Sequence, residues 1–106
     1  MAKWDNRKTE DLIKVILSLK NTKEAKRFFR DLLTEQEIIE LGKRWQAAQM
    51  LNKKIPYSKV EKETGLSSTT VARVSKWLNK GKKGYKLALK RLNIHHNSFS
   101  FGKGLS

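Results

Sequence analysis

Hydrophobic positions recur along this chain at intervals of three and four residues, which is the period of an amphipathic α-helix. In the first third they form two stripes, Leu12, Ile13, Ile16 and Leu19 and then Ala25, Phe28, Phe29 and Leu32. The first stripe predicts a helix that is capped by Thr9 and ends near Asn21, and the second predicts a helix that starts at Thr22. We interpret the adjacent Phe28 and Phe29 as core residues rather than as a platform for base stacking.

The clearest helix start lies at Thr34-Glu35-Gln36-Glu37. Thr34 is placed to cap the amide of Glu37 while the Glu37 side chain reaches back, as in a capping box. The helix is expected to run to about Leu51, and its seam repeats at spacings of three and four, which is typical of burial against another helix: Ile38, Leu41, Trp45 and Ala48. Gly42 lies in the middle of this helix, and we expect it to permit a close helix crossing.

The stretch from Tyr57 to Leu78 has the pattern of two short helices joined by a tight turn at Gly65. Val60 and Thr64 share a face in the first helix, and Val71, Val74 and Leu78 share a face in the second. Gly65 supplies the left-handed backbone that ends a helix, Leu66 fits the gap between the helices, and either Ser67 or Ser68 caps the second helix. This pattern predicts a helix-turn-helix whose second helix enters a DNA major groove, against the alternative of an ordinary helical hairpin.

After Leu78 the sequence predicts a basic turn, Asn79 to Gly84, and then a last helix with Tyr85, Leu89 and Leu92 on one side. Residues 93–106 show no apolar period, so we expect a mobile tail. The expected fold is therefore all-α, with a single helical domain over residues 1–92 and the helix-turn-helix at about 57–78.

The formal net charge of +14 is distributed unevenly. Residues 1–32 hold nine basic and five acidic side chains, residues 33–65 hold six and five, and residues 66–106 hold nine basic and no acidic side chains. Each Lys or Arg that neutralises a phosphate releases a condensed counterion, so a one-sided basic surface favours nucleic acid. The absence of acid after Glu63 makes a merely solvated charged face the weaker reading.

Within this pattern the candidate contacts to DNA fall into two groups. The non-core residues near the start of the second motif helix are predicted to read bases: Ser68, Thr69, Thr70 and Arg73. Lysines further along are predicted to contact phosphates: Lys76, Lys80, Lys82 and Lys83. The alternative is a basic protein that associates with DNA or RNA with little sequence choice, for which charge alone would suffice.

Other chemistry has little support in the sequence. The chain contains no cysteine, no paired carboxylates and no nucleophile with a plausible base, so an enzyme is not predicted and no cofactor or metal is expected. His95 and His96 are adjacent without a third ligand nearby, which is usually incidental. The longest apolar run is interrupted by Lys14, so we expect no membrane span and a cytoplasmic protein.

The order of these segments resembles the tryptophan repressor superfamily. The resemblance rests on Leu33–Glu37, Leu41–Arg44, Glu63–Gly65 and Thr70–Arg73, and within the superfamily it is greatest to the YerC/YecD group, through Ile16–Lys20 and Arg27–Thr34. It covers roughly residues 12–92 and implies a DNA-binding regulator that forms an intertwined homodimer. A homodimer also suits the apolar stripes, which are more than so small a monomer readily covers.

The resemblance also implies an effector pocket. In the tryptophan repressor the ligand lies between two arginines, and Arg44 and Arg73 fall at the matching positions, with Thr34 at a position beside that pocket. The repressor has a glycine directly after the second arginine, whereas this chain has Val74. A branched side chain there is expected to fill the space of the indole, so we predict that tryptophan is not an effector. Arg44 and Arg73 then have the alternative role of contacting phosphates or acids.

Overall fold

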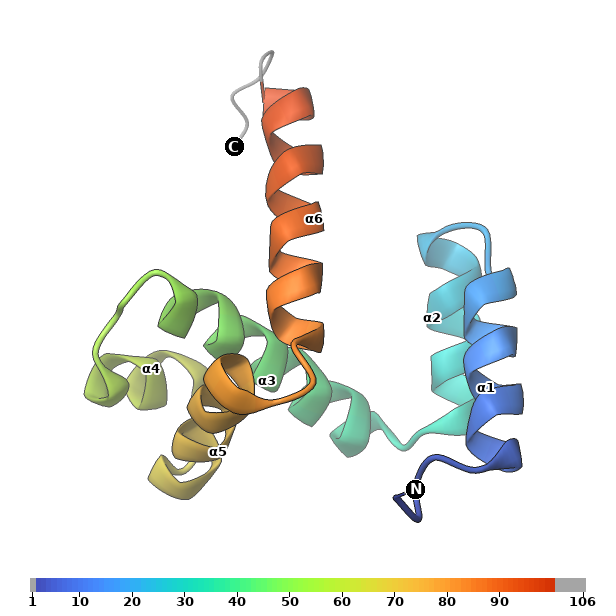
Figure 1. The fold of residues 1–106 in the computed structure, drawn as a ribbon, viewed down its shortest axis with the longest axis horizontal. Coiled ribbons are helices and arrows are strands. Elements are labelled where there is room, and N and C mark those ends of the chain that lie inside the picture. The colour runs from blue at the N-terminus through green and yellow to red at the C-terminus, as the bar shows by residue number, and fades with distance from the viewer. Residues whose placement is uncertain (1, 101–106) are drawn as a thin grey trace. The chain divides into compact units, whose positions relative to one another are not determined.

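The computed structural model describes residues 2–100, with side chains described through residue 93. Its helices are α1 (Arg7–Ser18), α2 (Thr22–Leu32), α3 (Glu35–Asn52), α4 (Tyr57–Thr64), α5 (Ser68–Lys80) and α6 (Gly84–Ser100) (Figure 1). The predicted all-α class is therefore confirmed over the described range. None of the helices in that range has the length and the apolar character needed to cross a membrane. The chain divides into two compact units, Met1–Ile39 and Glu40–Ser106, and each is considered by itself.

In the first unit, asparagine side chains start both helices. Asn6 caps α1, because its side-chain oxygen accepts from the backbone N–H of Thr9 at 3.0 Å, so the expected cap at Thr9 was wrong. Asn21 caps α2 by accepting from Glu24 N at 2.9 Å. The end of α1 was expected near Asn21, but α1 ends at Ser18, because Asn21 has the extended backbone and the side-chain hydrogen bond of the α2 cap. Asn6 and Thr9 lie three positions apart, and both are residue types that cap helices. The sequence alone does not distinguish them, and in the structure Asn6 is the cap.

The helical hairpin of α1 and α2 has apolar faces that the single chain does not bury. Neither helix contains a buried residue, and Leu17 is 77% exposed. Phe28 and Phe29 are half-buried, with ring centroids 6.0 Å apart in a tilted arrangement, so they contribute only partly to a core. The single chain therefore leaves apolar residues of both helices uncovered, among them Ile13, Leu17 and Leu32.

The capping box at the start of α3 is confirmed. Thr34 Oγ1 accepts from Glu37 N at 3.1 Å, and Thr34 N donates to Glu37 Oε1 at 2.9 Å. The expected seam is buried only at its later end, where Ala48 is inaccessible, while Leu41 remains 48% exposed. Among the described residues nothing lies within 4 Å of the position of a Cβ on Gly42, so the close crossing predicted there is not made within the single chain.

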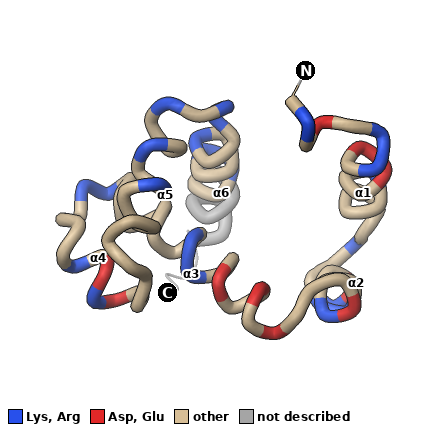
Figure 2. Tube along the Cα trace, turned by 90° about the horizontal axis from the view of Figure 1, so that it is seen from below, with Lys and Arg blue, Asp and Glu red and all other residues tan. Residues whose placement is uncertain are grey.

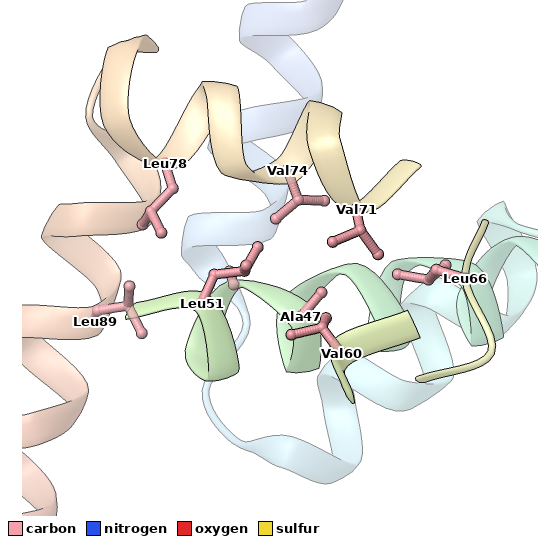
Figure 3. Packing of buried hydrophobic residues seen from close by; sticks show 9 residues of the cluster. Ala47, Leu51, Val60, Leu66, Val71, Val74, Leu78 and Leu89 are labelled. Atoms are coloured by element: carbon pink, nitrogen blue, oxygen red, sulfur yellow. The ribbon is translucent and has the colours of Figure 1, made fainter. Parts of the chain in front are cut away.

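The core of the second unit is formed between α3, α4 and α5 and is closed by α6 (Figure 3). Its buried apolar side chains point toward one another from four helices and the turn before α5: Ala47, Ala48, Leu51, Val60, Leu66, Val71, Val74, Leu78 and Leu89. Trp45 and Tyr85 extend this core at its edge, where their rings stack with centroids 6.4 Å apart. Because α4 and α5 each bury one face here, their mutual position is fixed by packing rather than by the short connection alone.

The last helix is longer than its apolar pattern. α6 continues through Ser100, whereas the period of Tyr85, Leu89 and Leu92 predicts an end near residue 92. No glycine or proline interrupts residues 93–100, so the backbone hydrogen bonding of a helix continues there without an apolar stripe. Of the tail that was expected to be mobile, residues 101–106 and the side chains of 94–100 lie outside the described residues.

Candidate nucleic-acid interface

The turn between α4 and α5 has the geometry that the sequence predicts. Gly65 has a left-handed backbone with φ 77°, and its N–H donates to the Glu61 carbonyl at 2.8 Å, which ends α4. The hydroxyl of buried Thr64 donates to the Val60 carbonyl at 2.7 Å and accepts from Leu66 N at 3.1 Å. Because both hydrogen bonds satisfy Thr64 inside the core, the turn is held from within as well as by its glycine.

Ser67, rather than Ser68, caps α5. Its Oγ accepts from Thr70 N at 3.1 Å, and its hydroxyl donates to Thr70 Oγ1 at 3.1 Å. Val71, Val74 and Leu78 then face the core. At 100° per residue, the opposite face of α5 consists of Thr69, Arg73, Lys76 and Lys80, all exposed. The packing of one face therefore presents a polar and basic face to solvent.

The structure separates the four predicted base-reading residues into two kinds. Ser68, Thr69 and Arg73 are exposed at the amino-terminal half of α5. Thr70 is half-buried, and its hydroxyl and amide both take part in the Ser67 cap. A contact from Thr70 to a base would compete with this cap, so Thr69 is the better placed of the two threonines. These base contacts remain predictions.

The predicted phosphate-contacting lysines follow the exposed face of α5 into the next turn. Lys76 Nζ lies 5.5 Å from the centroid of the Trp77 ring, whose residue is 49% exposed. Beyond Lys80, the turn residues Lys82 and Lys83 are exposed, and Lys83 has a left-handed backbone with φ 68°. The lysines thus form an exposed basic surface that extends the α5 face, although their contacts to phosphate remain predictions.

The charge distribution places this surface in a region without acid. In Figure 2, acidic segments appear in α1 to α4, whereas α5 and the described part of α6 show basic segments only. Glu61 and Glu63 on α4 are the last acidic residues before this region. Because α5 and the described part of α6 carry no carboxylate of their own, the lysines and arginines on them repel one another unless an anion is present, which favours binding of a polyanion.

The four candidate effector residues have different surroundings. Val74 is 2% exposed and lies in the core between Val71 and Leu78, as its helical phase predicts. Arg44 Nε is 3.6 Å from Glu40 Oε2, and it is buried without a hydrogen-bond partner among the described atoms. Arg73 is exposed on α5. Thr34 belongs to the other compact unit and has its hydroxyl engaged in the α3 cap.

A groove beside α5 was not predicted from the sequence. Two adjoining hollows share Tyr57, Ser75 and Asn79, and we call their combination the Tyr57 groove. Its rims carry lysines from three separate places in the chain: Lys54, Lys76, Lys80 and Lys86. The larger hollow has a volume of about 520 Å³. The sequence shows the basic face of α5 and the aromatic residue at the start of the motif. It does not show that Lys54 and Lys86 lie beside them, because only the fold brings these residues together.

Among the residues whose side chains are described, no cluster of three or more His, Asp or Glu side chains could hold a metal ion. His95 and His96 lie outside that set.

Comparisons with known proteins agree with this architecture. A family model described as Trp repressor protein matches residues 7–93. A Bacillus subtilis relative, the uncharacterized protein YerC, is 42% identical over 90 residues, which cover 85% of this chain and 86% of YerC. A crystal structure of a TrpR-like protein from Eubacterium eligens aligns with TM-score 0.82 and 38% identity over 87% of this chain and 95% of that one.

A putative Trp repressor from Staphylococcus aureus aligns with TM-score 0.81 and 34% identity over 89% of this chain and 97% of its own. The matches extend over both compact units and include all of the helix-turn-helix. This chain therefore belongs to the Trp repressor family.

Proposed function

We propose that this protein is a sequence-specific, DNA-binding transcriptional regulator that acts as a homodimer and reads DNA with α5. The observation that carries this proposal is the exposed α5 face, which follows a capped helix-turn-helix and lies in a region of the chain without acidic residues. Family membership supports the same reading. Proteins of this family are regulators rather than enzymes, so the chain is not an enzyme.

The polar residues on α5 favour sequence-specific binding over charge alone. A protein that needs only charge has no reason to place small hydroxyl side chains at the leading end of its exposed helix. Ser68 and Thr69 stand at that end, while the lysines stand at the other. This order matches a recognition helix, in which the amino-terminal residues reach base edges and the flanking cations contact phosphates. The experiment that decides between the two functions compares affinity for a selected duplex with affinity for random duplexes at the same salt concentration.

We expect a homodimer at micromolar concentration. Neither α1 nor α2 buries a residue within one chain, and Leu17, Ile39 and Leu41 are 77%, 50% and 48% exposed. In a dimer with two-fold symmetry, an intertwined second copy would cover the same apolar faces on both protomers. Light scattering should therefore give the mass of two chains, and two α5 helices should meet half-sites about 34 Å apart. A monomeric mass that stays unchanged when DNA is added would contradict this.

DNA binding is expected not to depend on tryptophan. Val74 is 2% exposed within the core, so it already supplies apolar packing at the position where the repressor has glycine. Glu40 also lies 3.6 Å from Arg44 Nε, and this pairing opposes capture of the carboxylate of an amino acid. A ligand raises DNA affinity only if it binds the DNA-bound conformation of the protein more tightly than the free conformation. A ligand that finds no site in either conformation therefore cannot change DNA affinity.

The measurement is titration of the preferred duplex with and without millimolar tryptophan, together with calorimetry of tryptophan with the free protein. We expect the same duplex affinity in both titrations and no heat of binding. A tenfold gain in DNA affinity, which corresponds to about 1.4 kcal/mol of coupling, would refute this expectation. Val74→Gly is the informative variant, because it removes the side chain that is expected to fill the pocket.

A further inference from the structure

The Tyr57 groove lies directly beside the exposed face of α5. Ser75 and Asn79 lie one turn apart on α5 and line both of its hollows. Tyr57, at the start of α4, lines both hollows as well and is 45% exposed. Asn79 Nδ2 donates to the Ser75 carbonyl at 2.9 Å, which fixes the amide and leaves its oxygen and second N–H directed elsewhere. The groove is thus lined by polar side chains, of which the Asn79 amide is held in a defined position.

The charges around the groove have one sign. Lys54 and Lys86 line one hollow, and Lys76 and Lys80 line the other. No aspartate or glutamate appears among the lining residues that the structure describes. Lys54 is held in place by the turn after α3, because it has a left-handed backbone with φ 65° and its N–H donates to the Leu51 carbonyl at 3.0 Å. Four cations in one open groove favour an anion over an apolar ligand.

The start of α4 adds to the positive potential of this groove. Pro56 occupies the N-cap position without a side-chain hydrogen bond, and the first turn contains no acidic residue. α1, α2, α3 and α5 all begin with a side chain that accepts from the helix amides. Lys59 N and Val60 N donate to the Pro56 carbonyl, so the amides of Tyr57 and Ser58 and the helix dipole remain available to an anion at the start of α4. Tyr57 itself lines the groove at this helix end.

We propose that the Tyr57 groove binds a phosphate of the DNA backbone, with Lys54 and Lys86 as its cationic contacts. This rests on the proposed function, since α5 must lie against DNA for the neighbouring groove to reach a strand. The groove extends the contact surface from α5 to the turn after α3 and to the start of α6. Because these contacts address phosphate, they raise affinity for every sequence and carry no base preference.

Neighbouring lysines in the same chain provide matched controls. Lys54→Gln is compared with Lys53→Gln, which removes the same charge one residue earlier, where the side chain lines a different hollow with Leu89 and Leu92. Lys86→Gln is compared with Lys90→Gln, one turn further along α6, which is exposed outside the groove. Each variant is titrated with the selected duplex and with random duplexes at several salt concentrations, and thermal unfolding of each confirms that it is folded.

We expect Lys54→Gln and Lys86→Gln to weaken binding to both kinds of duplex about three- to tenfold at low salt, and to reduce the slope of log K against log salt by about 0.9 per protomer bound. The controls should change affinity less than twofold and leave the slope unaltered. If each variant and its control change affinity and salt slope by the same amount, the proposal is overturned, while sequence-specific binding stands. Failure of the wild-type protein to distinguish the two duplexes would instead refute the proposed function.

The phosphate group bound in the groove could belong to a free phosphate compound instead of to the DNA backbone. Pyrophosphate is therefore added to the free protein at constant ionic strength and the melting temperature is followed. We expect at most a small increase that depends on Lys54 and Lys86, because a free anion lacks the other contacts that a duplex makes with α5. If pyrophosphate stabilises the wild-type protein but not these two variants, while all four substitutions affect duplex binding equally, the groove is a site for a free anion and the DNA assignment is overturned.

Discussion

Leu78→Ala is expected to lower the free energy of unfolding by about 2–5 kcal/mol. Leu78 is 4% exposed and lies on α5, where Figure 3 shows it directed toward Leu51 of α3 and Leu89 of α6. Truncation removes apolar contacts from a core that contains nine buried residues in the described part of the chain, and it leaves a cavity where three helices meet. The measurement is chemical denaturation at one fixed protomer concentration, because the stability of an oligomer depends on concentration.

Leu78→Met provides the control for this substitution. It conserves volume and apolar character, so its cost should stay below about 1.5 kcal/mol. If alanine costs no more than methionine, α5 is not held by this packing and the described core is wrong. Where the alanine variant remains folded at lower temperature, its affinity for the preferred duplex should fall too, because α5 loses the contact that positions its carboxyl-terminal half.

Thr69→Ala should cost about 1–3 kcal/mol on the preferred duplex and little on random DNA. Thr69 is exposed at the leading end of α5, on the face opposite the core. Its hydroxyl or methyl group is therefore placed to reach a base edge without disturbing packing. Fluorescence anisotropy with both duplexes at one salt concentration gives the two losses. Equal losses would show that Thr69 does not read a base.

Two further variants show whether the loss is specific to that position. Lys82→Ala should weaken binding to both duplexes alike and reduce the salt dependence, as loss of a phosphate contact does. Thr70→Ala should instead lower stability by about 1 kcal/mol, because Thr70 Oγ1 accepts from the Ser67 hydroxyl. A base preference that follows Thr70 rather than Thr69 would reverse the order that the structure suggests.

Local features of this fold were predictable because each depends on residues close together in sequence. Gly65 has the left-handed backbone that its position in the motif requires, and Thr34 and Glu37 form the expected reciprocal cap. Val74 is buried because it lies one turn after Val71. In each case a single helical turn contains the whole signal, so no knowledge of the tertiary fold is needed.

Features that depend on distant residues were not predictable in the same way. Lys54 and Lys86 line one groove because α3, α5 and α6 meet there, and nothing in their local sequence marks them as partners. Leu41 has the correct phase for burial, yet it is 48% exposed because the single chain places nothing over it. The end of α6 was missed for a different reason, since a helix without glycine or proline needs no apolar stripe to continue.

Recognition of a particular DNA sequence by α5 is tested by selection from genomic DNA. Fragments of genomic DNA are selected on the wild-type protein, and the affinity of the enriched duplex is then compared with that of a shuffled duplex of equal length at physiological salt. We expect an affinity ratio of about 10³ or more, with the enriched site containing two related half-sites about one helical turn apart. A ratio near one at every salt concentration, with steep salt dependence for both duplexes, would contradict it and would leave a basic protein that binds nucleic acid by charge alone.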